Sequence, residues 1–280
     1  MTTEQPKQAG SNSMTAHDVS YLRDDQYRTP DRLNARILLH SKYGVSKIDW
    51  FEWIHSSIEW DSVQNVLEVG CGTGLLWSSL PDTVKGNLQL TLTDLSPSMV
   101  EVSLLHARKQ LENVQSLEAN VQNLPFETAS FDLVVANQML YHVPDPSLAL
   151  AEVSRVLKPG GTLIASTVGP LHLLELFEIE ALVFGVRRDR SHADVFGSQN
   201  GREMLERKFV DIEWRQFEDA LRCTNLADVV AYLTSVPPGE TANSEELRQL
   251  RVEVEHRMHE SAGVLEVTKD SGLFLARHPR

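Results

Sequence analysis

An apolar run enters a glycine-rich turn about a quarter of the way along the chain. Residues 66–69 read Val-Leu-Glu-Val, and Gly70, Gly72 and Gly74 follow at G-x-G-x-G spacing. The run predicts a buried strand, and the glycines allow backbone conformations and close ligand contacts that a Cβ atom would prevent. A helix that begins after such a turn points its first amides at a ligand. The feature predicts a ligand-binding unit of an α/β fold.

Strand and helix patterns alternate after this turn, which favours a parallel sheet. The expected strands cover residues 65–69, 88–93, 114–118, 131–136 and 162–168. Helices are expected over 75–80, from Pro97 to about 110, and over 146–157, with Ser96 as the N-cap of the second. The centre of the chain is therefore expected to form a Rossmann-like core.

The flanking segments differ in composition from this centre. Residues 1–16 are polar and are expected to form a disordered tail, and 17–60 a helical cover. The core is placed at 61–170, a helical lid at 171–208, and the completion of the sheet at 209–280. Adjacent aromatics Trp50, Phe51 and Trp53 on one predicted helix are interpreted as core packing.

Composition excludes several classes of partner. The 280 residues carry a formal net charge of −13, which opposes binding to nucleic acids and to anionic membranes. The only cysteines, Cys71 and Cys223, are expected to be reduced thiols, and neither a signal segment nor a membrane span is predicted. We expect a cytoplasmic protein whose oligomeric state the sequence leaves open.

A dinucleotide site is the main alternative interpretation of the glycine turn. Such sites use G-x-G-x-x-G, whereas the spacing here is G-x-G-x-G. Glu68, directly before the turn, would also place a carboxylate near a pyrophosphate. A cofactor that carries an ammonium and a sulfonium fits this surrounding better than NAD.

Asp94 stands at the end of the second predicted strand, where open α/β sheets bind ligands. Its carboxylate can accept hydrogen bonds from both hydroxyls of a ribose. The alternative is that Asp94 only caps the following helix, a role that Ser96 already supplies.

Two further segments complete a family pattern. Residues 118–126 read Glu-Ala-Asn-Val-Gln-Asn-Leu-Pro-Phe, and 131–137 read Phe-Asp-Leu-Val-Val-Ala-Asn. With the glycine turn and Asp94, residues 63–168 resemble class I S-adenosylmethionine-dependent methyltransferases. The resemblance is strongest to the branch of ubiquinone and menaquinone biosynthesis and other small-molecule enzymes. It implies a mostly parallel seven-stranded sheet, helices on both faces and a helical lid.

The resemblance also implies the residues that contact the cofactor. Those at the methionine end are Gly70, Gly72, Gly74 and Glu68, with Tyr21 and Arg36 from the cover. Those around the adenosine are Asp94 for the ribose, Leu95, Met99, Asn120 and Val121 for the adenine, and Asn137 through its main-chain carbonyl. Glu68 is as well explained by a purely structural role, and Arg36 by an exposed helix surface.

His142 is the candidate general base, because it follows the fourth strand and an imidazole accepts protons near neutrality. A structural histidine is the alternative. Arg187, Arg188, Arg190 and His192 in the lid are candidates to attract an anionic substrate. No residue spacing indicates a metal site or a hydrolase nucleophile, and residues 137–140 lack the pattern of enzymes that methylate planar amino groups.

The predicted function is methyl transfer from S-adenosylmethionine to oxygen or carbon, and less favourably nitrogen, of a small organic metabolite. Positioning is expected to be the main catalytic device, because methyl transfer is an in-line displacement. A non-catalytic S-adenosylmethionine-binding module and an NAD-dependent oxidoreductase are the alternatives.

Overall fold

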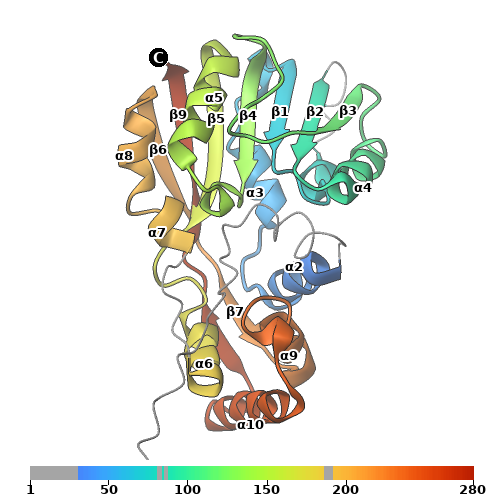
Figure 1. Cartoon of the computed structure of the whole chain (residues 1–280), viewed down its shortest axis with the longest axis vertical. Coiled ribbons are helices and arrows are strands. Elements are labelled where there is room, and N and C mark those ends of the chain that lie inside the picture. Colours follow the sequence, from blue (N-terminus) through green and yellow to red (C-terminus); the bar gives the residue numbers. More distant parts are fainter. Residues whose placement is uncertain (1–30, 81–83, 85–87, 186–191) are drawn as a thin grey trace, which may run out of the picture.

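A seven-stranded sheet forms the upper part of the molecule in Figure 1, with strand order β3-β2-β1-β4-β5-β9-β6. The computed structural model describes residues 31–80, 84, 88–185 and 192–280. The strands are β1 (Asn65–Val69), β2 (Gln89–Asp94), β3 (Val114–Glu118), β4 (Phe131–Asn137), β5 (Leu157–Val168), β6 (Phe209–Phe217) and β9 (Ser271–Pro279). The first five are mutually parallel, and β9 is antiparallel to both of its neighbours. The predicted mostly parallel α/β sheet is confirmed.

The upper part of the molecule also contains five helices among the described residues: α3 (Trp50–Ser56), α4 (Pro97–Ala107), α5 (Pro146–Val156), α7 (His192–Phe196) and α8 (Gly201–Glu206). Among the described residues, short 3₁₀ turns cover Trp60–Ser62, Leu75–Ser79 and Leu140–His142. The predicted cap of α4 forms, since Ser96 accepts a hydrogen bond from the Met99 amide, and Asp145 caps α5 by accepting from the Ser147 and Leu148 amides. Their side chains fix where α4 and α5 begin.

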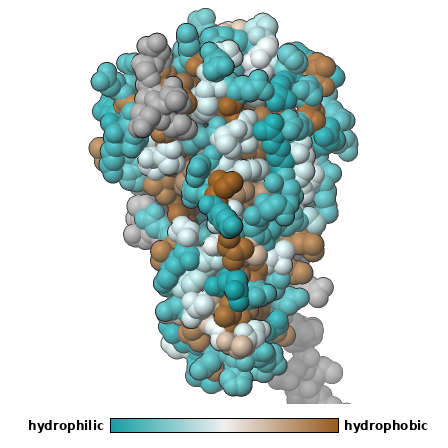
Figure 2. All heavy atoms as spheres, turned by 180° about the vertical axis from the view of Figure 1, so that it is seen from behind, coloured by the Kyte–Doolittle hydropathy of each residue, from teal (hydrophilic) through white to brown (hydrophobic). Residues whose placement is uncertain are grey.

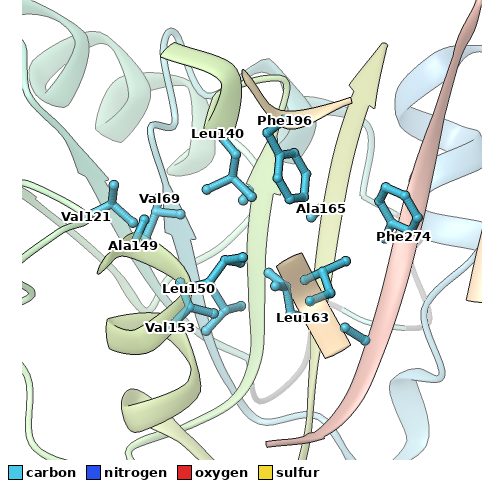
Figure 3. Close-up of a cluster of buried hydrophobic side chains, with 14 of the residues drawn as sticks. Val69, Val121, Leu140, Ala149, Leu150, Val153, Leu163, Ala165, Phe196 and Phe274 are labelled. Atoms are coloured by element: carbon cyan, nitrogen blue, oxygen red, sulfur yellow. The ribbon is translucent and has the colours of Figure 1, made fainter. Parts of the chain in front are cut away.

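Both faces of the sheet are buried, as a parallel sheet requires. Along β1, Leu67 and Val69 pack into one apolar cluster, and Val66 packs into a second cluster on the opposite face. Figure 3 shows the first cluster, in which Phe196 of α7 lies near Ala165 of β5 and Phe274 of β9. Packing on both faces holds the carboxyl ends of the strands in fixed positions.

The lower part of Figure 1 is a cap, which we define as helices α2, α6, α9 and α10 with a two-stranded sheet. Its elements are α2 (Asp31–Tyr43), α6 (Leu174–Phe184), β7 (Ala220–Cys223), α9 (Leu226–Leu233), α10 (Ser244–Glu260) and β8 (Leu265–Thr268), with a 3₁₀ turn at Gly239–Thr241. A separate apolar cluster holds them together, with Leu39, Leu176, Val230 and Leu250 among its members. The cap therefore has its own core.

The region expected to complete the sheet, 209–280, is divided between the main sheet and the cap. Strand β6 ends at Phe217 and is followed by β7 from Ala220, and β8 ends at Thr268 before β9 begins at Ser271. Asp219 stabilises the first break, because its Oδ1 accepts hydrogen bonds from the Val45 and Ala220 amides at 2.8 and 2.9 Å. Residues 209–280 thus supply most of the cap as well as two strands of the sheet.

The segment expected to act as a lid is distributed over several places. Helix α6 packs on α10 and β8 in the cap, α7 contacts the turn at Leu140–His142, and α8 lies against β6 and β9. Arg187, Arg188 and Arg190 lie outside the described residues. Of this segment, α7 is the part that lies beside the candidate base.

The surface is mixed in polarity. On the face shown in Figure 2, hydrophilic residues dominate and hydrophobic residues reach the surface in small groups, including along the middle of the molecule. Within the described ranges, no helix combines the length and apolar character needed to cross a membrane.

Candidate active site

A cavity of about 580 Å³ lies between the carboxyl ends of the parallel strands and the cap. Gly70, Asp94 and Asn137 line it from the ends of β1, β2 and β4, while His40 and Tyr232 line it from α2 and α9. Its volume lies within the range of small-molecule sites, and its position at the strand ends is where open α/β sheets bind ligands. The sheet supplies one end of the cavity and the cap supplies the other.

The glycine turn follows β1 at the sheet end of the cavity. Gly70 has φ +61°, and a Cβ atom there would lie 2.9 Å from the Met139 Cβ. Gly72 also has positive φ, but its added Cβ would meet only Leu33 Cδ2, at 3.4 Å. Gly70 and Gly72 line the cavity, whereas Gly74 packs its backbone against Ser103 of α4. The turn therefore leaves a surface that a ligand can approach closely.

Asp94 ties the glycine turn to the start of α4. Its Oδ2 accepts a hydrogen bond from the Gly72 amide, and its Oδ1 accepts one from the Ser96 amide, both at 2.9 Å. Burial raises the pKa of Asp94 from its ordinary value, against the lowering effect of these amides. A carboxylate has about four acceptor sites, so Asp94 retains capacity for ligand hydroxyls at the cavity wall.

Glu68 is buried at the end of β1 and lines the same end of the cavity. The indole Nε1 of Trp77 donates a hydrogen bond of 2.6 Å to its Oε2. Burial raises the pKa of Glu68 to about 8, with the nearby Asp94 adding to the rise and the Trp77 hydrogen bond opposing it. Near neutral pH the free protein therefore holds Glu68 largely protonated, and a neighbouring cation would favour its ionised form.

The residues expected around an adenine are mostly at the cavity wall. Leu95, Asn120 and Val121 line it, and Asn120 Oδ1 accepts a hydrogen bond of 2.9 Å from the Gln122 amide. This bond shapes the turn after β3. Met99 is fully buried on α4 and is not among the lining residues, so the structure places it behind the wall.

Asn137 is the last residue of β4, and hydrogen bonds fix the orientation of its side chain. Its Oδ1 accepts hydrogen bonds from Ser166 Oγ at 2.7 Å and from Trp50 Nε1 at 3.2 Å. The next residue, Gln138, has φ +55°, and its amide donates to Ser166 Oγ at 2.9 Å. These contacts fix the turn that leads to His142.

His142 lines the cavity at the end of the 3₁₀ turn after β4. Its ring centroid lies 4.9 Å from that of His192 and 4.7 Å from that of Tyr141, and Tyr141 stacks on His192 at 4.4 Å. The Tyr141 hydroxyl donates to Gln138 Oε1 at 3.0 Å. Helix α7 thus brings His192, expected in the lid as a candidate to attract an anionic substrate, beside the candidate base.

Arg36, on α2, lines the cavity from the cap side. Tyr21 lies outside the described residues, as does Tyr27 of the same predicted cover. The structure therefore brings together all the predicted site residues that it describes, except that Gly74 and Met99 stand behind the wall.

Sequence reasoning missed several residues of the cavity. Trp50, interpreted as core, lines the cavity and holds Asn137. His172 and Lys269 also line it, from the connections β5–α6 and β8–β9. No local motif marks these two residues, because only the pairing of those connections brings them together. The Gly169 amide donates to Asp270 O, and Leu173 donates to Thr268 O, both at 2.8 Å.

Residues 67–165 match a family model described as a methyltransferase domain. The match starts within β1 and ends within β5, so it includes the glycine turn, Asp94 and His142. This part of the chain has the sequence pattern of a methyltransferase domain. Its architecture is that of the class I methyltransferases.

Curated relatives of the methyltransferase domain act on different molecules. The chain is 41% identical over 125 residues to malonyl-[acyl-carrier protein] O-methyltransferase of Hahella chejuensis, covering 44% of this chain and 42% of the relative. It is 42% identical over 104 residues to ubiquinone biosynthesis O-methyltransferase of Xanthomonas oryzae, covering 37% of this chain and 42% of the relative. The matches thus span less than half the length of these relatives.

The fold of the methyltransferase domain also recurs in solved structures. A candidate methyltransferase from Bacillus halodurans C-125 superposes with a TM-score of 0.58 at 16% identity. The superposition covers 82% of this chain and 99% of that chain. This likeness shows the class I fold.

Proposed function

We propose that the chain is an S-adenosylmethionine-dependent methyltransferase that acts on oxygen or carbon of a small organic acceptor. The observation that carries the proposal is the sheet end of the cavity, where the glycine turn, Glu68 and Asp94 share one wall. Nitrogen is the less favoured acceptor. The names of both curated relatives, which are O-methyltransferases, support oxygen.

The residues present fit S-adenosylmethionine. Gly72 offers a close approach to backbone, Asp94 has acceptor capacity for two ribose hydroxyls, and Glu68 is a buried carboxyl that a cation would ionise. Leu95, Asn120 and Val121 would border the adenine, and the Asn137 carbonyl would accept from the cofactor amino group. The cofactor, when bound, supplies an electrophilic methyl group on a sulfonium.

The chain's own contribution to the reaction is positioning and exclusion of water. The cavity is lined on one side by the strand ends and on the other by the cap, so an acceptor would be held between them. His142 would take the proton of a neutral hydroxyl acceptor at an imidazole nitrogen. Tyr141 and His192, whose rings contact it, would hold its orientation.

The proposal also includes a cytoplasmic location and an acceptor that is not a nucleic acid. Both cysteines are free and buried, which is usual for a cytoplasmic protein. A net charge of −13 disfavours nucleic acid as the acceptor.

The deciding experiment is methyl transfer itself. The protein is incubated with S-adenosylmethionine carrying a labelled methyl group and a host metabolite extract, and labelled small molecules are identified by mass spectrometry. Calorimetry with S-adenosylmethionine and with NAD accompanies it. Binding of NAD alone would support an oxidoreductase instead. Binding of S-adenosylmethionine without any labelled product would support a non-catalytic module.

A further inference from the structure

The cavity has ends of opposite charge character. Glu68 and Asp94 lie at the sheet end, whereas Arg36, His40, His172 and Lys269 lie at the cap end. Two further carboxylates line the cavity and are committed to other contacts: Asp49 caps α3 by accepting from the Phe51 and Glu52 amides, and Asp219 pairs with Lys269. The proposed function occupies the sheet end with the cofactor and leaves His40, His172 and Lys269 without a role.

The cap-end residues come from separate parts of the chain and meet at the connections between sheet and cap. His40 of α2 stacks on His172, with ring centroids 5.9 Å apart and an angle of 9° between the planes. Tyr232 of α9 approaches His40 edge-on at 6.2 Å. His172 Nδ1 is buried and has no hydrogen-bond partner among the described residues.

Lys269 provides a buried positive charge beside this pair. Its Nζ lies 2.5 Å from Asp219 Oδ2, and its side chain is 7% exposed. Asp219 is already used for structure, since its Oδ1 accepts from the amides of Val45, Ser46 and Ala220. With Arg36, the cap end therefore holds two cations against one committed carboxylate.

Both imidazoles are held neutral, mainly by burial and also by nearby positive charges. Burial, together with the charges of Lys269 and Arg36, lowers the pKa of His40 to about 3. The pKa of His172 is also lowered, by burial and then by His40 and Lys269. An anion at this position would be attracted to the cations and could accept hydrogen bonds from neutral imidazole N–H groups.

We propose that the cap end of the cavity binds an anionic group of the methyl acceptor, a carboxylate or a phosphate, through His40, His172 and Lys269 with Arg36 alongside. The anion anchors the acceptor at one end of the cavity, and the atom to be methylated faces the sheet end near His142. This inference rests on the proposed function, because it assigns the substrate class of that site.

The test compares probes of similar shape and different charge. The full chain, saturated with S-adenosylhomocysteine, is titrated by calorimetry with 4-hydroxybenzoate, with its neutral methyl ester and with phenyl phosphate. At least one anion should bind about tenfold or more tightly than the ester, as expected for charge-assisted hydrogen bonds. The stronger anion distinguishes a carboxylate from a phosphate site.

Substitutions of the two cap-end histidines test whether these residues bind the anion. In His172→Gln and His40→Gln, the preference for the anion should fall at least fivefold while affinity for the ester stays the same. His256→Gln, on the exposed face of α10, is the matched control and should change neither. Circular dichroism and S-adenosylhomocysteine binding confirm that each variant is folded.

Anions that bind no more tightly than the ester, including probes that do not bind measurably, would overturn the proposal. An anion preference that is unchanged in both histidine variants would also overturn it. A protein that binds neither S-adenosylmethionine nor S-adenosylhomocysteine would instead overturn the proposed function. The two failures are therefore separable.

Discussion

The indole of Trp77 donates a 2.6 Å hydrogen bond to a carboxyl, Glu68, that burial keeps largely protonated near neutral pH. The folded pKa, about 8, lies above the ordinary value of 4.5. Between these values the folded state binds more protons than the unfolded state at this group. Stability contributed by Glu68 therefore falls as pH rises through that window.

Glu68→Gln should remove this contribution, because an amide oxygen can still accept from Trp77 but does not titrate. We expect the melting temperature of the variant minus that of wild type to increase steadily from pH 5 to pH 8. Scanning calorimetry of the ligand-free proteins measures it. Added S-adenosylmethionine should raise the melting temperature of the wild type more than that of the variant. A temperature difference that is constant with pH would contradict the assignment.

Asp94→Ala should weaken S-adenosylmethionine binding by about 2–4 kcal/mol, since two charge-assisted hydrogen bonds to the ribose are lost. The variant also frees the Gly72 amide, so Asp94→Asn, which keeps an acceptor, should lose less. Asp145→Ala is the matched control, because Asp145 likewise accepts two amides but is exposed and does not line the cavity. Calorimetry that finds unchanged affinity in a folded Asp94→Ala protein would reject the ribose assignment.

His142→Gln should reduce turnover by roughly a hundredfold while leaving the Kd for S-adenosylmethionine nearly unchanged, as expected for loss of a general base. His192→Gln should have a smaller effect, because its ring contacts that of His142 and would only orient it. Single-turnover transfer to the identified acceptor gives the rate. Full activity of His142→Gln would make this residue a structural one.

Leu39→Ala should lower the free energy of unfolding by about 2–5 kcal/mol, because the side chain is fully buried in the cap core. The neighbouring Leu38 is 49% exposed, so Leu38→Ala is a control that should change stability little. Urea denaturation provides both values. Equal effects of the two substitutions would show that α2 does not pack on the cap as described.

Cofactor and acceptor together should slow amide hydrogen exchange in residues 33–40 and 174–184, because α2 and α6 carry or adjoin cavity-lining residues. Hydrogen–deuterium exchange with mass spectrometry tests this, with α8, which lies against β6 and β9 and supplies no cavity-lining residue, as the internal reference. Truncation through Tyr43 would remove more than a gate, since the Tyr43 hydroxyl donates to Asp228 at 2.6 Å within the cap. Such a truncation should abolish transfer.

Local signals predicted the core well because the determinants of its elements are adjacent in sequence. The Ser96–Pro97 pair begins α4 as expected, and the strand predicted over 114–118 is β3. The glycine turn and Asp94 also carry their information locally, since strand ends of a parallel sheet meet at one edge. Their direct contact follows from the pairing of β1 with β2.

The cap was not predictable in the same way. An alternating pattern such as that of β8 is the same whether the strand joins the main sheet or pairs with β7 in a small separate one. His40, His172 and Lys269 are far apart in sequence, so only the tertiary pairing of the connections places them together. Trp50 resembled a core aromatic because indole rings at a cavity wall and in a core give the same helical pattern.

The two ends of the cavity are encoded in separate stretches of the gene product. Residues 67–165 contain Glu68, Asp94 and His142, whereas His40, His172 and Lys269 all lie outside them. Mutations that alter the ligand bound at the cap end can therefore accumulate while the residues proposed to bind S-adenosylmethionine stay unchanged. Such an arrangement makes the protein a good starting point for laboratory evolution. Libraries restricted to the cap side would search for new acceptors among variants that still hold the methyl donor.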